Sequence, residues 1–347
     1  MHFGLVAAGS LLIDYVLTVS VSIAAGVDAL TSAFPALVPY NVIFGLAMIL
    51  IIVVVNLRGV RESGSIFAAP TYLFVGSFLL MIVVGIIHAA MNGGLLHNLP
   101  PQPSNFPATE HLSLFLILTA FASGCAAMTG TEAISNGVPI FKPRQEKNAA
   151  ATLVMMATLL GIMYAGTTFL TWRYGISPQQ NSNPTVDSQL ASLFFTGWFG
   201  WFFYVIQFAT ALILVLAANT SFADFPRLSS ILARDEYLPH IFSRQGDRLV
   251  FNTGIIVLGI LSAVLLVIFS GNTEALINLY ALGVFTAFTL SQSGMVRRWL
   301  RTREPHWRRG LAINAFGALA TGIVTLIIAV SKFDRGAWIV VILIPLL

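Results

Sequence analysis

Nine long apolar runs decide what this chain can fold into. A helix crosses the hydrocarbon core of a membrane with about 20 apolar residues, and each run is near that length. Because lipid offers no partner to backbone N–H and C=O groups, such runs are expected to be helical. The runs cover about residues 3–33, 42–57, 65–90, 112–134, 149–172, 194–220, 251–270, 274–294 and 310–331.

The composition excludes an ordinary water-soluble globule. Of the 347 residues, 57% are hydrophobic and 9% are charged, whereas about a quarter of an average soluble domain is charged. We therefore predict an all-α integral membrane protein in which residues 1–347 form a single transmembrane transporter domain. A tenth run opens at Gly336 and continues to Leu347, about half the length of a span, so we interpret it as a partial helix.

The basic residues predict the orientation of the chain. If the first run leads outward from the cytoplasm, four cytoplasmic loops hold 15 of the 18 Lys and Arg residues. The opposite loops hold only Arg173, Lys332 and Arg335. This asymmetry follows the positive-inside rule. We expect a multi-pass protein of the cell inner (plasma) membrane.

The first run carries a carboxylate near mid-membrane depth, at Asp14. Thr18 and Ser22 follow at four-residue spacing, so the three side chains are predicted to share one helical face. Such a ladder of oxygens suits a cation that has lost its water. Alternatively, Asp14 bonds a neighbouring helix and the two hydroxyls bond their own i−4 carbonyls. Tyr15 is as well suited to packing as to ligation.

The fourth run is predicted to be a broken helix. Ser123, Gly124 and residues 129–131 place glycines and hydroxyls at its middle, and Glu132 follows. Unwinding within a membrane is tolerated where the freed carbonyls line a site. Thr129 and Glu132 are three residues apart and could face that opening together. The alternative is a packing face of small residues with Glu132 at the cytoplasmic interface.

Other polar residues in the runs have simpler interpretations. Asp28 lies near the outer end of its run and is expected to be solvated, and Asp224 is followed by Arg227, which favours a local ion pair. Tyr280 could belong to an aromatic belt or to a site. The chain contains no HExxH sequence, no GxSxG elbow and no phosphate-binding glycine loop, so an enzyme is not expected.

Three stretches resemble a known family. They read LLIDYVLTVSVSIAAGVDALTSAFP, AFASGCAAMTGTEAISNGVPIFKPRQEKNAA and LYALGVFTAFTLSQSGMVRRW. They are similar to the amino acid, polyamine and organocation (APC) permease superfamily, and more narrowly to its KimA-type potassium permeases, which are related to the KUP family. The resemblance implies twelve helices in a LeuT-type inverted-repeat fold. The present runs would match the third to the eleventh helix, so we expect a chain truncated at both ends that lacks the broken first helix.

The resemblance also implies a cation site. Asp14, Tyr15, Thr18 and Ser22 would match the site-facing side of the third helix. Thr129 and Glu132 would match the broken sixth helix, and Tyr280 the tenth. On this basis potassium would be held through Asp14, Thr18 and Thr129. Glu132 would couple proton movement to it, since apolar surroundings favour a neutral carboxyl and a bound cation favours a charged one.

The leading functional hypothesis is therefore secondary active transport, as proton-coupled potassium uptake. An amino acid permease of the same superfamily is the main alternative, and a non-transporting fragment or accessory membrane subunit is the third. No cofactor is expected, only transported K⁺ and H⁺. As partners we expect the lipid bilayer and a small cation, allow for a homodimer, and expect no nucleic acid.

Overall fold

The computed structural model describes residues 2–59, 64–91, 113–128, 130, 134, 137–138, 141–177, 183–246, 251–303 and 307–333. In these residues the chain is helical and contains no strand. The α-helices are α1 (His2–Ala33), α2 (Asn41–Leu57), α3 (Gly64–Met91), α4 (Leu114–Cys125), α6 (Gln145–Tyr174), α7 (Val186–Phe194), α8 (Trp201–Arg234), α9 (Asn252–Ile268), α10 (Thr273–Thr302) and α11 (Trp307–Ser331). The 3₁₀ helices are η1 (Pro35–Tyr40), η2 (Ala126–Met128), η5 (Gly197–Phe199) and η6 (His240–Ser243).

The helices confirm the predicted spans within the described residues. Seven helical segments are long and apolar enough to cross a membrane, and α4 and α9 are shorter apolar helices. Three predicted boundaries are wrong, because α8 begins at Trp201 and not at residue 194, α8 continues to Arg234, and α10 continues to Thr302. The added segment of α8, residues 221–234, is polar in part, yet it buries Ser229, Ser230 and Ala233. The predicted tenth run lies outside the described residues.

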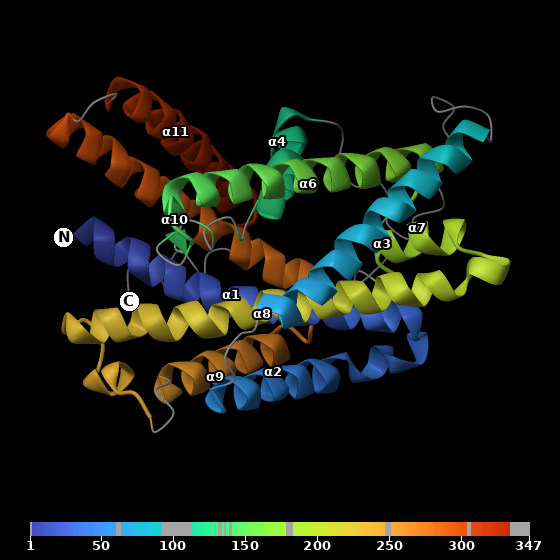
Figure 1. The fold of residues 1–347 in the computed structure, drawn as a ribbon, viewed down its shortest axis with the longest axis horizontal. Helices are drawn as coiled ribbons and strands as arrows, with labels where there is room; N and C mark the ends of the chain where they lie inside the picture. Colours follow the sequence, from blue (N-terminus) through green and yellow to red (C-terminus); the bar gives the residue numbers. More distant parts are fainter. Residues whose placement is uncertain are drawn as a thin grey trace.

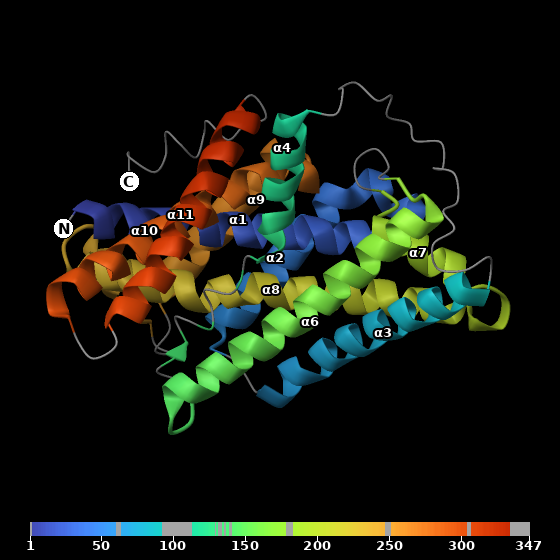
Figure 2. The same cartoon turned by 90° about the horizontal axis from the view of Figure 1, so that it is seen from above.

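Helix α1 lies at the centre of the bundle and belongs to two of its apolar cores. One core joins α1 to α2, α8 and α9, and the other joins α1 to α4, α10 and α11. A third core joins α3, α6, α7 and α8 on the far side of α8. Figures 1 and 2 show α1 and α8 side by side, with α2 and α9 on one side and α10 and α11 on another. This arrangement makes α1 and α8 the shared scaffold of the molecule.

The outer helices present apolar side chains at the surface. Ile43, Leu50 and Ile51 of α2 are each more than 60% exposed, as are Phe316 and Leu326 of α11. An exposed apolar surface of this extent is costly in water and is expected where helices face lipid. The chain is accordingly a multi-pass membrane protein.

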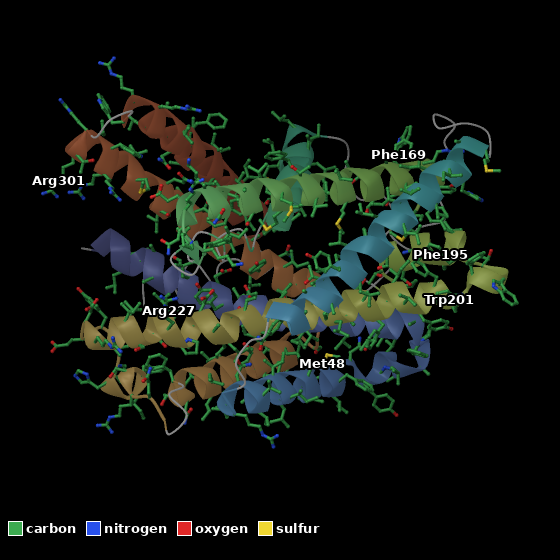
Figure 3. All side chains as sticks on the ribbon, viewed as in Figure 1. Met48, Phe169, Phe195, Trp201, Arg227 and Arg301 are labelled. Carbon is green, nitrogen blue, oxygen red and sulfur yellow. The ribbon has the colours of Figure 1, made fainter. Side chains whose placement is uncertain are left out.

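The helix termini next to the Lys- and Arg-rich loops lie at one end of the bundle. Helices α1 and α6 begin there, and α2, α8 and α10 end there, at the left of Figure 1. Figure 3 places Arg227 and Arg301 at this end and Phe195 and Trp201 near the other. This grouping agrees with the alternation of basic loops from which the cytoplasmic side was predicted.

Candidate functional site

A cavity of about 920 Å³ lies among α1, α4, α6, α8 and α10. Tyr15, Thr18 and Ser22 line it from α1, and Tyr280 lines it from α10. The structure thus brings together four of the seven side chains that the sequence suggested as cation ligands. Tyr280 is 8% exposed, so it is a buried wall residue of the cavity, and the aromatic-belt interpretation of this tyrosine is wrong.

The hydroxyls of α1 divide into two groups. Those of Ser10, Ser20 and Thr31 donate to carbonyls four residues earlier, at 2.8, 3.0 and 3.0 Å. The hydroxyls of Thr18 and Ser22 form no hydrogen bond within the described part of the chain. The i−4 alternative therefore does not hold for Thr18 and Ser22, and their oxygens are available to the cavity.

Asp14 lies beside the cavity and is not one of its lining residues. Its side chain is 1% exposed, and the next residue, Tyr15, forms part of the wall. A carboxylate this deep in a membrane helix is costly unless it meets a partner or a polar pathway. The burial of Asp14 fits the depth expected from the sequence, and its role as a cation ligand stays a prediction.

The fourth predicted run is broken, as its glycines and hydroxyls suggested. Helix α4 ends at Cys125 and the 3₁₀ helix η2 follows. Gly130 has φ +89°, a left-handed conformation that glycine adopts without steric cost. Ser123 and Gly124 line the cavity from α4, and Gly130 lines it beyond the break. The predicted ligands Thr129 and Glu132 lie outside the described residues.

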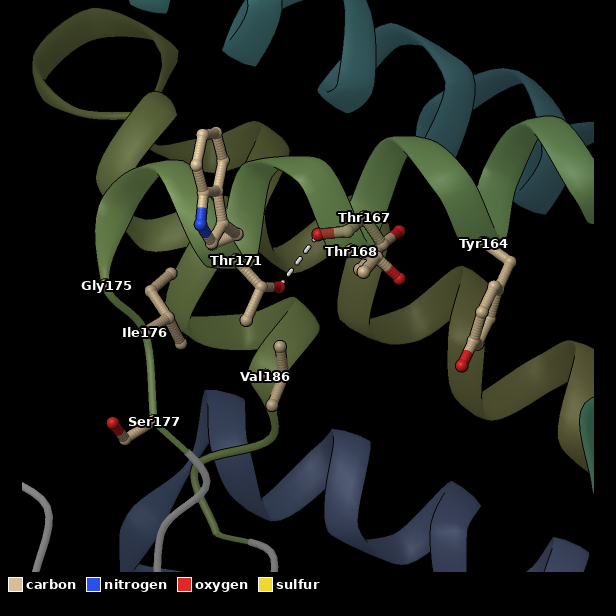
Figure 4. A pocket seen from close by; sticks show the side chains of 9 residues that line it. Tyr164, Thr167, Thr168, Thr171, Gly175, Ile176, Ser177 and Val186 are labelled. Atoms are coloured by element: carbon tan, nitrogen blue, oxygen red, sulfur yellow. Dashed lines mark hydrogen bonds between the residues drawn. The ribbon is translucent and has the colours of Figure 1, made fainter. Parts of the chain in front are cut away.

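Tyr164 of α6 is a wall residue that the sequence did not single out. An added Cβ at Gly124 would lie 2.9 Å from the Tyr164 hydroxyl oxygen, so the glycine permits this close approach. Tyr164 also lines a second hollow of about 520 Å³, shown in Figure 4, with Thr167, Thr168 and Thr171. Nothing in the spacing of the fifth run distinguishes this tyrosine from a lipid-facing aromatic.

Helix α8 contributes polar residues to the cavity wall that the sequence pattern did not indicate as site residues. Thr220, Ser221 and Asp224 all line the cavity. The ion pair predicted between Asp224 and Arg227 is not a direct contact, because the described structure contains no such pair within 4.0 Å, and Arg227 acts on the carboxylate through a longer-range coulombic interaction. The three-residue spacing allowed a direct pair, but Asp224 is a lining residue of the cavity.

Asp28 also differs from the expectation. It is 3% exposed, and its Oδ2 accepts a hydrogen bond of 2.6 Å from Thr273 Oγ1 at the start of α10. Nearby, Asn183 donates to Thr31 Oγ1 at 2.8 Å. Asp28 is therefore a buried structural link between the outer ends of α1 and α10, not a solvated carboxylate.

Comparison with known proteins agrees with this architecture. The model of the amino acid permease family matches residues 2–346. The potassium transporter KimA of Bacillus subtilis (strain 168) is 49% identical over 347 residues, which are 99% of this chain and 55% of KimA. The chain thus spans about half the length of that curated relative. The match across the helices that form the cavity shows that the chain belongs to the amino acid permease family.

Proposed function

We propose that this chain forms part of the transport pathway of a proton-coupled potassium importer of the cell inner membrane. The observation that carries the proposal is a set of four hydroxyls on the cavity wall, those of Thr18, Ser22, Ser123 and Ser221. None of the four forms a hydrogen bond within the described part of the chain. The Ser221 hydroxyl is fully buried, and a buried hydroxyl without a partner costs about 1–3 kcal/mol, so its retention calls for a ligand.

The chemistry of these groups suits a cation. Hydroxyl oxygens can replace the water shell of an ion. Two carboxylates add negative charge, since Asp224 lines the cavity and Asp14 is buried beside it. Among the described residues that line the cavity, none is a Lys or Arg that would repel such an ion. Similarity to a potassium transporter supports potassium as the ion.

Proton coupling is assigned to Glu132 within this proposal. A carboxyl that binds either a proton or a neighbouring potassium ion makes the two occupancies compete. Competition at one place is the minimum requirement for linking the two fluxes. The support for Glu132 comes from its place in the sequence, three residues after Thr129.

The family name favours a second candidate, uptake of an amino acid. An amino acid would present a carboxylate as well as an amine, and the wall carboxylate Asp224 would repel the former. Potassium is therefore the better match to the groups that line the cavity.

The test is growth of a potassium-uptake-deficient bacterial strain at low external potassium. We expect the chain, expressed with whatever further helices its gene encodes, to restore growth. Thr18→Val should abolish the rescue, because it replaces an unbonded wall hydroxyl by a methyl group of the same shape. Thr210→Val is the matched control, since the Thr210 hydroxyl donates to Ile206 O at 2.8 Å and does not line the cavity.

Two results would contradict the proposal. One is an absence of rescue by a well-expressed wild-type protein. The other is uptake of a labelled amino acid that potassium does not affect.

A further inference from the structure

Helices α10 and α11 meet at the cytoplasmic side in a dense cluster of positive charge. Residues 297–309 hold six of the chain's 18 Lys and Arg residues, and Glu304 is the only acid in the sequence between Glu274 and Asp334. All six arginines are exposed. We refer to them as the α10–α11 basic patch, which consists of Arg297, Arg298, Arg301, Arg303, Arg308 and Arg309.

Close packing of the two helices makes the patch one surface. An added Cβ at Gly310 of α11 would lie 2.6 Å from Trp299 Cε2 and 2.7 Å from Trp299 Cζ2, so the indole of α10 lies directly against the backbone of α11. Figures 1 and 2 show the two helices side by side, and Figure 3 places Arg301 at their common end. Arginines at the end of α10 and at the start of α11 therefore share one surface.

A second tryptophan gathers two of the guanidinium groups. Arg303 Cζ lies 5.7 Å from the centroid of the Trp307 ring, and Arg308 Cζ lies 5.6 Å from it. Both distances are within the range of a cation–π interaction, which is about 6 Å. The shared ring holds two like charges near each other, and like charges repel. An anion bound beside them would offset that repulsion.

The positive charge is not balanced within the described part of the chain. There, Arg301, Arg308 and Arg309 form no ion pair within 4.0 Å. Arg308 and Arg309 also lie in the first turn of α11, which contains no acid. A positive charge at a helix N-terminus opposes the helix dipole. These two arginines therefore do not stabilise α11 electrostatically, and a partner outside the chain would explain them.

The α11 surface beyond the patch is apolar and exposed. Arg309, Ile313 and Phe316 lie at i, i+4 and i+7 and share a helical face. Ile313 is 62% exposed, and Phe316 is 75% exposed. A molecule with its anionic group at Arg309 would thus lie with its remainder along an apolar surface. This pairing of charge and apolar surface fits a phospholipid and gives a free phosphate ion no further contact.

From these observations we infer that the α10–α11 basic patch binds the headgroup of an anionic phospholipid of the cytoplasmic leaflet. Arginine forms paired hydrogen bonds with phosphate oxygens. Clusters of about four to eight basic residues next to a membrane helix attract anionic lipid. The positive-inside rule alone asks for basic residues on this side and not for two of them on one indole ring. The inference goes beyond the proposed function, because a lipid can bind here whether or not the cavity carries potassium.

The test counts the lipids that are bound to the protein. Protein in dodecyl maltoside is titrated with dioleoyl phosphatidylglycerol, and native mass spectrometry measures the bound fraction. Dioleoyl phosphatidylcholine has the same acyl chains and a zwitterionic headgroup, so we expect it to bind more weakly. The triple variant Arg303→Gln, Arg308→Gln, Arg309→Gln should lower the apparent affinity for phosphatidylglycerol at least about tenfold, because each basic residue near anionic lipid contributes roughly a fivefold factor.

The matched control removes three charges from another basic loop. The variant Lys142→Gln, Arg144→Gln, Lys147→Gln changes the net charge equally, and all three side chains are exposed. Arg144 has φ +69° and Arg303 has φ +46°, so each triple contains one arginine in the left-handed region. The control should keep the affinity of the wild type. A third variant, in which lysine replaces the same three patch arginines, keeps the charge and should retain part of the binding.

The outcomes decide the inference. We expect phosphatidylglycerol to bind the wild type and the control more tightly than the glutamine triple of the patch, with the lysine triple between them. Equal affinities for phosphatidylglycerol and phosphatidylcholine would overturn the inference. An equal loss in both glutamine triples would also overturn it, because that result indicates a general effect of net charge. Release of the lipid by inorganic phosphate, but not by chloride of equal ionic strength, would assign the patch to a soluble anion instead.

Discussion

Alanine at Gly254 tests how closely α9 packs on the helix that carries Asp224. An added Cβ at this position would lie 2.8 Å from Pro226 Cα, 2.9 Å from Pro226 Cβ and 3.3 Å from Pro226 Cγ. Carbon atoms in favourable contact are about 3.5–4.0 Å apart. The nearest atom belongs to the backbone of α8 and cannot rotate away, so one helix has to recede from the other by roughly 0.7 Å.

The cost can be estimated from this geometry. Overpacking of a close contact costs about 1–3 kcal/mol. Alanine recovers at most about 1 kcal/mol of helix propensity relative to glycine, and less here because Gly254 lies in the first turn of α9. We expect a net destabilisation of about 1–2 kcal/mol. Uptake should fall as well, because Pro226 is two residues from Asp224 and moves with it.

The assay is thermal unfolding in detergent, followed by the fluorescence of the six tryptophans. Gly161→Ala is the matched control, since Gly161 lies in the middle of α6 and an added Cβ would meet nothing within 4 Å. Gly254→Ala should unfold at a lower temperature than wild type, and Gly161→Ala at the same temperature or higher. Equal midpoints for the two variants would refute the packing argument.

Three further predictions concern single residues. Ser262→Ala removes a hydrogen bond of 3.2 Å from Ser262 Oγ to Val16 O, and should lower stability by about 0.6 kcal/mol, the average for such bonds between membrane helices, measurable by the same unfolding assay. Burial raises the pKa of Asp187 from 3.8 to about 6, so the folded state holds the proton more tightly and stability should fall as pH rises from about 4 to about 6. Asp187→Asn should flatten that part of a plot of unfolding temperature against pH, and an unchanged slope would contradict the assignment. Glu132→Gln should make ⁸⁶Rb⁺ uptake independent of an imposed proton gradient, and uptake that still follows the gradient would exclude Glu132 as the coupling residue.

The apolar runs predicted the membrane helices because length and hydrophobicity are local properties of the chain. The break after α4 was predictable for the same reason, since glycines and hydroxyls in the middle of a span weaken the helix there. The shared face of Thr18 and Ser22 followed from helical spacing alone. Each of these predictions depends on residues close together in sequence.

The errors concern contacts between residues that are far apart in sequence. Asp28 is bonded to Thr273, 245 residues away, so its burial could not be derived from its position at the end of a run. Asp224 had a basic neighbour three residues on, and only the packing of α8 against α1 revealed that it faces the cavity. Helix α8 extends past its apolar run because Ser229 and its neighbours are buried by the surrounding chain.

The most direct test of the account is potassium-dependent uptake through the cavity. Liposomes that contain the protein would be filled with a potassium-free buffer and given an inward proton gradient. ⁸⁶Rb⁺ would then be added to the external solution. We predict uptake by the wild type that excess unlabelled potassium suppresses and that amino acids do not, and loss of that uptake in Asp14→Asn at equal protein content. Wild-type rates in Asp14→Asn, or uptake that amino acids suppress and potassium does not, would contradict the central claim that α1 forms a potassium pathway.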